Sequence, residues 1–468
     1  MNRRAAVVAL LLCLLLVALD QTAVATALPT ISAELGSTAA LSWVMAAYLL
    51  TATVSTPLWG KFSDIHGRRM LLLAAILVFV AGSAWAGFSS DLASLVAARG
   101  LQGVGGGGIT VLVFASVAEL VSPRERGRFV GLFGAAFGLA SVLGPVVGGF
   151  LTQAASWRWI FYINLPLGLL ALFTIAVALR LPHKPGGRRV NWFGPLLLIL
   201  AVGGLMIGLL TASPSSGIPV IGTVLLIGVG LVSLVALIWT EQHSAEPLLP
   251  LRVVNHPVVR ISASLGLIVG LVTTGTIIYV PAYLQGALGA TPAASGLQLL
   301  PFVGGTLVSA VLVGQLITRT GAYRVFPIAG SVAATLGLLI LAQLVTDTSS
   351  LWLAVGLTLL GGGLGAIIPV LTVAAQSAVT PRDIGVVTST TSLARSLGST
   401  IGATGFGLIW GVTLASESDG QPVGMPSVDA VAGASQNIFT ATAIIMAFAI
   451  LLSVRLPQIH LRTIIDEA

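Results

Sequence analysis

Residues 60–69 of the chain have the sequence GKFSDIHGRR and separate two long apolar runs, at 41–59 and 71–88. Gly60 and Gly67 stand where a short turn must bend or let another segment come close. Runs of about 20 apolar residues have the length of a helix that crosses a lipid bilayer. The stretch therefore predicts a tight turn between two membrane-spanning helices.

Charged residues flank this turn on both sides. Asp64 is expected at the end of the first helix and Arg68 and Arg69 at the start of the next, so the three can form a local charge network. Glu119, which follows a later apolar run, is a further expected partner. The alternative is an ordinary loop whose basic residues only fix orientation. The spacing G-x-x-x-D-x-x-G-R-R favours the more specific interpretation.

Apolar runs of similar length recur along the whole chain. Each is expected to be a helix, because every backbone polar group inside a bilayer has to be satisfied within its own segment. The first run begins like a signal peptide, but it continues past Asp20, so we expect it to be the first span. The expected structure is an all-α membrane protein with fourteen transmembrane helices. The spans are 5–27, 41–59, 71–88, 92–116, 128–150, 158–179, 191–212, 218–239, 258–283, 294–317, 324–345, 350–372, 386–411 and 436–455.

The composition agrees with this fold and excludes several other classes. Only 8% of the 468 residues are charged, whereas a soluble protein has roughly 25%. The net charge of +7 does not indicate nucleic-acid binding, because the basic residues lie in short clusters between apolar runs. The single cysteine, Cys13, permits neither an internal disulfide nor a cysteine metal cluster. We expect no metal and no cofactor.

The basic residues alternate between the two sides of the expected membrane. Nineteen of the 22 fall on one side, which the positive-inside rule assigns to the cytoplasm. The opposite side has Arg158, whereas Arg99 and Arg395 fall inside spans. We therefore expect a multi-pass protein of a bacterial inner membrane with both termini in the cytoplasm.

Three further stretches narrow the interpretation. The fourth span contains RGLQGVGGG at 99–107, the fifth GPVVGG at 144–149, and the first LDQT at 19–22, followed by ALP at 27–29. With the turn quoted above, they resemble signatures of the major facilitator superfamily, and in particular of its fourteen-helix drug:proton antiporters. The resemblance implies two six-helix bundles with two linking helices, and a monomer in the bilayer. It also implies a small-molecule substrate that is exchanged for protons.

A partial internal repeat agrees with that plan. Residues 314–324, GQLITRTGAYR, are a degraded copy of 60–69 that lacks the acidic residue. Two related six-helix halves are one standard transporter plan. We expect an N-terminal bundle at 1–183, two linking helices at 184–250 and a C-terminal bundle at 251–468.

The fifth span resembles the signature of exporters. Its small residues Gly144, Gly148 and Gly149 are expected to pack closely against a neighbouring helix. Pro145 removes a backbone hydrogen bond and permits a kink, so the resemblance implies a conformational role for this stretch. Ala140 stands where the signature usually has glycine.

Two charged residues lie deep within spans. Asp20 and Arg99 are each about seven residues from the outer ends of their helices, which places both ~10 Å below the surface. A charge at that depth is a functional candidate, and the resemblance implies that the two helices are neighbours. We expect Asp20 to accept the transported proton and to contact a substrate cation, and the alternative is a static ion pair that fixes packing. Arg99 either tunes Asp20 or bonds exposed backbone carbonyls.

A third charge, Arg395, is expected nearer to the cytoplasmic end. Its long side chain can extend to that interface, so we expect it to have a structural or gating role.

The resemblance also implies which spans line a substrate cavity. Tyr279 and Tyr283 are four residues apart and share a helix face, where they could stack on a flat or cationic substrate or lie at the membrane interface. Trp157 is expected to be an interface anchor. The polar and aromatic candidates for the cavity are Asp20, Gln21, Tyr48, Tyr279, Tyr283 and Gln298.

These features favour a proton-coupled antiporter that exports small amphipathic or cationic compounds. A lipid, a siderophore or a self-made antibiotic is the alternative cargo. An enzyme or receptor is not favoured, because the sequence has no phosphate-binding loop and its five histidines lie outside the expected spans.

Overall fold

The computed structural model describes residues 3–35, 40–179, 193–211, 219–244, 251–290, 292–344, 349–380, 383–417 and 427–458. The regular elements within these ranges are all helices, so the all-α prediction is confirmed. The longer ones are α1 (Arg3–Leu35), α2 (Ala40–His66), α3 (Arg68–Phe88), α4 (Leu92–Leu120), α5 (Pro123–Ala154), α7 (Asn164–Ala178), α8 (Phe193–Leu210), α9 (Val220–His243), α11 (Pro257–Gly286), α13 (Leu300–Thr320), α14 (Val325–Leu341), α15 (Ser350–Ser377), α16 (Ile384–Glu417) and α17 (Val428–Val454). Three short helices are α6 (Trp159–Tyr162), α10 (Leu251–Val254) and α12 (Pro292–Leu297).

Each expected span coincides with one of the longer helices, preceded in two cases by a short one, α6 or α12. Nine of the described helices are long and apolar enough to cross a bilayer by length and composition. The helical fold is therefore confirmed, and fourteen membrane crossings remain a prediction.

The tight turn predicted within residues 60–69 has the expected backbone. Gly67 adopts φ 91° between the end of α2 and the start of α3, a conformation that side chains strongly disfavour. In the degraded copy of this stretch, Gly321 ends α13 with φ 70°. Both turns therefore use a glycine with positive φ, but their ψ angles differ, 139° at Gly67 and −7° at Gly321.

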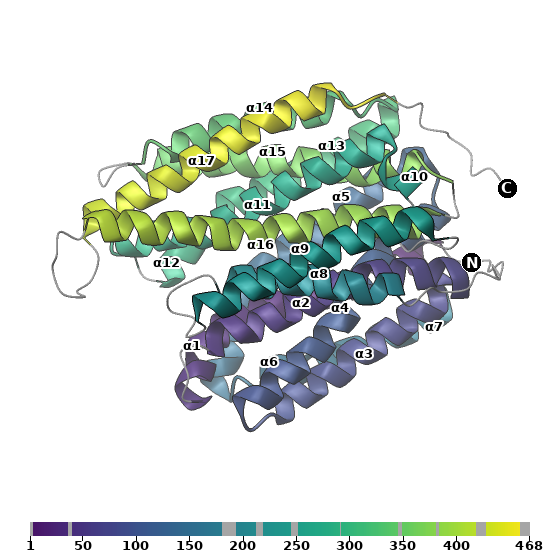
Figure 1. The fold of residues 1–468 in the computed structure, drawn as a ribbon, viewed down its shortest axis with the longest axis horizontal. Coiled ribbons are helices and arrows are strands. Elements are labelled where there is room, and N and C mark those ends of the chain that lie inside the picture. The colour runs from purple at the N-terminus through teal and green to yellow at the C-terminus, as the bar shows by residue number, and fades with distance from the viewer. Residues whose placement is uncertain are drawn as a thin grey trace.

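The long helices run side by side along one axis of the molecule (Figure 1). In this view most of α1 to α7 lie below most of α11 to α17, and α8 and α9 cross the front between them. The start of α1 and the end of α17 lie at the same end of the array, which we call the terminal end. The opposite end is called the distal end. The positive-inside pattern predicts that the terminal end faces the cytoplasm.

The two groups of helices touch through small residues and polar contacts. A side chain at Gly131 of α5 would lie only 2.5 Å from the carbonyl oxygen of Ala310 of α13. Gln376 of α15 donates a hydrogen bond of 3.5 Å to the carbonyl oxygen of Phe114 of α4. The expected division into 1–183, 184–250 and 251–468 stays a prediction, because residues 180–192 and 245–250 lie outside the described ranges.

The linking pair covers the seam between the groups. Leu197 and Leu198 of α8 belong to one apolar cluster with Val54 of α2 and Leu393 of α16. The helix α9 packs on α8 and presents many apolar side chains outward, as a lipid-facing helix does.

The tryptophans near helix ends differ in exposure. Trp159 and Trp352 are more than half exposed, as expected for interface anchors. The prediction for Trp157 was wrong, because its side chain is buried. Its ring packs on Phe161, and its Nε1 donates a 2.7 Å hydrogen bond to Glu34, so it fixes the distal ends of α1 and α6.

Candidate functional site

The deep charges of the first and fourth expected spans form an ion pair. Arg99 of α4 donates from Nη1 to Oδ2 of Asp20 of α1 over 2.7 Å. Asp20 is 1% exposed and Arg99 is fully buried. A carboxylate at such a depth needs a cationic or hydrogen-bonding partner, because an isolated ion would be strongly destabilised there. The spacing of the two residues from their helix ends therefore predicted a contact that the structure contains.

Two amide side chains complete the environment of the carboxylate. Gln102 of α4 and Asn164 of α7 each donate a 2.8 Å hydrogen bond to Oδ1 of Asp20. Both amides also donate to the hydroxyl of Ser83 of α3, and that hydroxyl donates to the carbonyl oxygen of Phe161. The network thus links α1, α3, α4 and α7. Both oxygens of Asp20 are occupied by protein donors, so neither is open to a substrate in this conformation.

Sequence reasoning missed Asn164 and Ser83. Asn164 could have been identified from its depth in the expected span 158–179, which is otherwise largely apolar. It lies about six residues from the outer end of that span, at nearly the same level as Asp20. Ser83 gave no such signal, because single serines are common in membrane helices.

Arg99 contacts both the carboxylate of Asp20 and a backbone carbonyl, and a role in tuning the proton affinity of Asp20 stays a prediction. Besides Asp20, it contacts the side chain of Gln102 at 2.5 Å and approaches the carbonyl oxygen of Val44 at 3.5 Å. Its guanidinium lies over the ring of Tyr48, 4.4 Å from the centroid, which is a favourable cation–π geometry. Its Nη2 has no hydrogen-bond partner among the described residues. One donor therefore stays available inside the network.

The glycines that follow Arg99 let neighbouring helices approach closely. A methyl group at Gly103 would lie 2.3 Å from the carbonyl oxygen of Tyr48, and one at Gly105 would lie 2.4 Å from the backbone nitrogen of Phe79. The absence of side chains therefore brings α2 and α3 against opposite sides of α4, which places Tyr48 beside the ion pair.

The exporter-like stretch of α5 packs against the first motif of α1. The hydroxyl of Thr22 donates a 2.9 Å hydrogen bond to the carbonyl oxygen of Ala140, and a methyl group at Gly144 would lie 1.9 Å from that hydroxyl. Gly148 is buried, whereas Gly149 has open space beside it. The side chain of Pro145 lies outside the described residues.

The turn at 60–69 forms the expected charge cluster at the terminal end. Arg68 pairs with Asp64 at 3.3 Å and with Glu119 at 3.2 Å, and it also donates to the carbonyl oxygen of Ala115. Arg69 does not join this cluster. It donates a 2.6 Å hydrogen bond to the end of α7, at the carbonyl oxygen of Ala176.

The same cluster touches the other half of the chain. Gly60 of α2 faces Gly385 in the first turn of α16, and a methyl group at Gly385 would lie 2.6 Å from both Asp64 Oδ2 and the carbonyl oxygen of Gly60. A carboxylate near the start of a helix is stabilised by the helix dipole. The contact therefore holds the two halves together at the terminal end.

The second half repeats only part of this arrangement. Arg324 at the start of α14 donates to the carbonyl oxygen of Val454 at the end of α17 over 2.5 Å, as Arg69 does from α3 to α7. The stretch 314–324 has no equivalent of Asp64, and the ion pair that the described residues have in this half, Arg252 with Asp383 at 3.4 Å, joins α10 to the start of α16.

The expected substrate residues do not gather in one place. Gln21 donates to the hydroxyl of Tyr48 over 3.3 Å, close to the ion pair. Tyr279 and Tyr283 are both buried on α11, so a position at the lipid interface is excluded for them. Gln298 lies at the break between α12 and α13. A substrate role for these residues stays a prediction.

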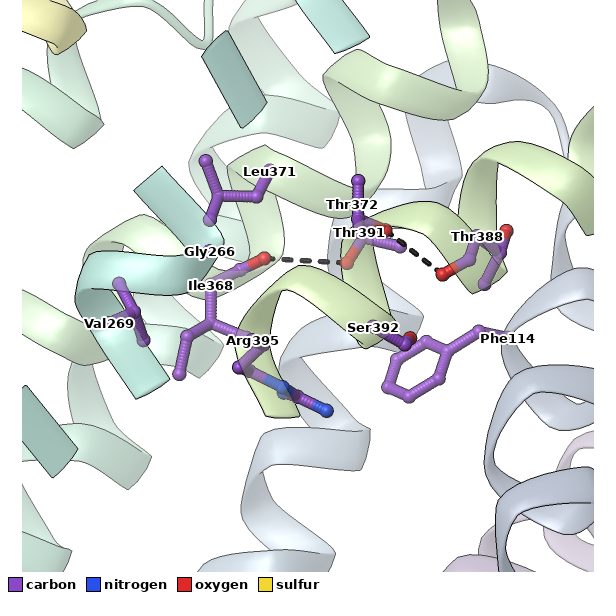
Figure 2. Close-up of a pocket in the computed structure, with 10 residues that line it drawn as sticks. All are labelled: Phe114, Gly266, Val269, Ile368, Leu371, Thr372, Thr388, Thr391, Ser392 and Arg395. Atoms are coloured by element: carbon purple, nitrogen blue, oxygen red, sulfur yellow. Dashed lines mark hydrogen bonds between the residues drawn. The ribbon is translucent and has the colours of Figure 1, made fainter. Parts of the chain in front are cut away.

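A small cavity lies between α11, α15 and α16, and Phe114 of α4 borders it (Figure 2). The cavity is lined by Arg395 but by none of the six residues that were expected to bind substrate. The expected extension of Arg395 to the cytoplasmic interface was therefore wrong. Its side chain lines this cavity, about eleven residues into α16.

The sequence profile of the Major Facilitator Superfamily matches residues 10–403. The chain belongs to this superfamily. A major facilitator transporter of Mycobacterium tuberculosis, itself uncharacterised, is 37% identical over 405 residues, which cover 86% of this chain and 58% of the relative. The chain therefore spans a little over half the length of that relative. Multidrug resistance protein 3 of Bacillus subtilis is 31% identical over 435 residues, which cover 92% of this chain and 84% of that protein.

Solved structures of the superfamily share the fold. The human organic anion transporter MFSD10 superposes with a TM-score of 0.70 at 18% identity, covering 97% of this chain and 100% of the other. Likeness at this identity shows the fold alone. Relatives that share this superfamily with the chain are named as transporters.

Proposed function

We propose that this chain is a proton-coupled antiporter that exports small amphipathic molecules, cationic ones among them, across the plasma membrane of a bacterial cell. The observation that carries the proposal is the buried ion pair between Asp20 and Arg99. The similarity to Multidrug resistance protein 3 supports export of drug-like compounds. A potential of ~100 mV supplies about 2.3 kcal/mol for each proton that enters, which can drive accumulation against a gradient.

Asp20 is the proposed proton carrier. Protonation would remove its charge and its attraction for Arg99, while Arg99 keeps its contacts with Gln102 and Tyr48. The helices α4 and α7, which bind this carboxylate through Arg99 and Asn164, would then be held less tightly to α1. This loss of charge is the proposed link between the proton and a change in helix packing.

The terminal end is the proposed gate. The close approach of Gly60 to Gly385, next to Asp64, would hold this end closed while the substrate leaves at the distal end. Opening would require the first turn of α16 to leave the carboxylate of Asp64. The proposed moving bodies are the two six-helix halves, 1–183 and 251–468.

The test uses purified protein in liposomes with an imposed pH gradient and ethidium as a cationic probe. Asp20→Asn, which has nearly the same shape, is expected to abolish ethidium movement driven by the pH gradient and to leave movement down an ethidium gradient. Asp91→Asn is the control, because Asp91 caps the start of α4 outside the ion pair and asparagine caps helices equally well.

Two results would contradict the proposal. Gradient-driven transport by Asp20→Asn equal to that of the unchanged protein would show that Asp20 does not carry the proton. Loss of both kinds of transport together with loss of thermal stability would instead favour the static ion pair that fixes helix packing.

A further inference from the structure

Arg395 lies well inside α16, and unlike the deep Arg99 of α4 it faces no acidic residue. In the described residues it has neither an ion pair nor a hydrogen bond from its side chain. Arg99 has Asp20, Arg68 has Asp64 and Glu119, and Arg158 has Glu34.

The sequence of the surrounding helices explains this. The helices α11, α13, α14 and α15 contain no aspartate or glutamate, and α16 has none before Glu417 in its last turn. Within the apolar layer the N-terminal half carries one positive and one negative charge, Arg99 and Asp20. The C-terminal half carries Arg395 alone. An uncompensated cation at this depth is unfavourable unless an anion joins it.

The lining of the cavity shows which atoms could meet such an anion. Ser392 precedes Arg395 by three residues and so lies on the same face of α16. The hydroxyls of Thr388 and Thr391 already donate to backbone carbonyls of their own helix, at 2.7 Å and 3.0 Å, so their protons are engaged. The described contacts leave the hydroxyl of Ser392 without a hydrogen bond. The free donors of the cavity are therefore Arg395 and Ser392.

The remaining walls are apolar. Val269 of α11 and Ile368 and Leu371 of α15 line the cavity across from α16, and Phe114 borders it (Figure 2). A planar guanidinium matches a carboxylate with two parallel hydrogen bonds, which makes arginine a preferred partner for this group. One wall of the cavity thus has a positive charge and hydrogen-bond donors, and the other walls are apolar. Such a cavity suits a molecule with an acidic head and an apolar body.

We propose that this cavity binds the head group of an amphipathic carboxylate, with Arg395 as its charge partner and Ser392 as a second donor. The inference rests on the proposed transport function and adds an anionic substrate class to it. Because the cavity is small, the head group is the part it can enclose in this conformation. The site is separate from Asp20, so anion binding and proton transfer are carried by different residues.

Binding is tested on the purified full chain with a pair of fluorescent probes, dansyl-undecanoic acid and its methyl ester. The unchanged protein is expected to bind the acid at least ~10-fold more tightly than the ester, as the loss of a charged hydrogen bond predicts. Arg395→Met, which replaces the charged side chain by a long apolar one, is expected to remove this preference. It should lower the affinity for the acid and leave the affinity for the ester unchanged. Ser392→Ala is expected to lower the affinity for the acid by a few-fold. Arg455→Met is the control for net charge, because Arg455 is exposed at the end of α17.

Each other outcome overturns the inference. Equal affinity of the unchanged protein for acid and ester would exclude recognition of the charge. Unchanged acid binding in Arg395→Met would exclude Arg395 as the partner. Displacement of the probe by sodium chloride as effectively as by unlabelled undecanoate would show a site for small inorganic anions. If Arg395→Met does not fold, the acid-to-ester preference of the unchanged protein and its reduction in Arg395→Lys decide the question, since lysine keeps the charge without the planar fork.

The outcomes separate the two proposals. Proton-driven ethidium transport with no preference for the acid would retain the antiporter and reject the anion site. The opposite result is also possible, in which the acid binds only when Arg395 is present but no probe moves in response to a pH gradient. That result would retain the anion site and reject proton coupling.

Discussion

The hydroxyl of Thr22 lies 2.9 Å from the carbonyl oxygen of Ala140, and the position that a methyl group would take at Gly144 is only 1.9 Å from the same hydroxyl. The same hydroxyl lies 2.9 Å from the carbonyl oxygen of Ala18 and 3.2 Å from that of Leu19, so its single proton is shared among acceptors of α1 and α5. The motif that holds Asp20 and the exporter-like stretch of α5 are therefore in direct contact.

Gly144→Ala is expected to disrupt this contact. The added methyl group must displace Thr22 or separate α1 from α5, and overpacking of this kind destabilises a core by about 1–3 kcal/mol. Thermal unfolding in detergent measures the loss of stability, and the initial rate of ethidium transport measures its effect on function. Gly149→Ala is the matched control, because nothing lies within 4 Å of the methyl group it would add. Equal effects of the two substitutions would show that the α1–α5 contact is not sensitive to packing at Gly144.

Gly385→Ala is expected to open the terminal end. Its methyl group would lie 2.6 Å from both Asp64 Oδ2 and the carbonyl oxygen of Gly60, so α2 and α16 must move apart. The measurement is the rate of thiol labelling at Ser389→Cys, a fully buried position beside Gly60, in a Cys13→Ala background. We expect labelling to become several-fold faster.

The control for this prediction lies on the same helix. Gly405→Ala adds a methyl group to α16 at a position with open space, so labelling should stay at the rate of the parent. A rate that does not rise in Gly385→Ala would mean that the glycine contact does not hold this end closed.

Asn164→Leu is expected to destabilise the N-terminal half. The change removes donors from Asp20 and Ser83 and leaves buried acceptors with fewer partners, which is expected to lower the free energy of unfolding by about 1–3 kcal/mol. Asn437→Leu is the matched control, because the single long hydrogen bond of Asn437 to Thr413 is exposed. Thermal unfolding compares the two. A similar small change for both would show that Asn164 is not needed to hold α7.

The pair of Glu34 and Arg158 is expected to give a pH-dependent contribution to stability at the distal end. The hydrogen bond from Arg158 holds the pKa of Glu34 below its usual value of 4.5, with a second contribution from Trp157. Because the folded-state pKa is lowered, the contact stabilises the fold above pH 4.5 and the stabilisation is lost as the pH falls through the folded-state pKa. Glu34 is half exposed, so the effect is expected to be small.

The measurement compares the unfolding temperature of the unchanged protein with that of Glu34→Gln from about pH 3 to about pH 7, a range that brackets the usual pKa of 4.5. The two are expected to differ at pH 7 and to converge at pH 3. A difference that is independent of pH would assign the effect to shape and not to the charge of Glu34.

The position of the deep ion pair could be predicted from the sequence, because helix geometry converts residue number into depth. Asp20 and Arg99 lie equally far from the outer ends of the expected spans 5–27 and 92–116, and a helical carboxylate in an apolar run requires a partner. Arg69 shows that depth along a helix does not predict the partner of a side chain. It is next to Arg68 in the sequence, yet it bonds the end of α7, because adjacent residues on a helix point about 100° apart.

The sequence by itself determined the helical fold, the tight turn at Gly67 and the level of each charge within its helix. It could do so because hydropathy, backbone restrictions and helical rise are local properties. Only the tertiary structure decided which residues meet around Asp20 and that Arg395 lines a cavity instead of reaching the interface. These depend on how each helix is rotated about its axis and which neighbour it faces, and long-range packing sets both.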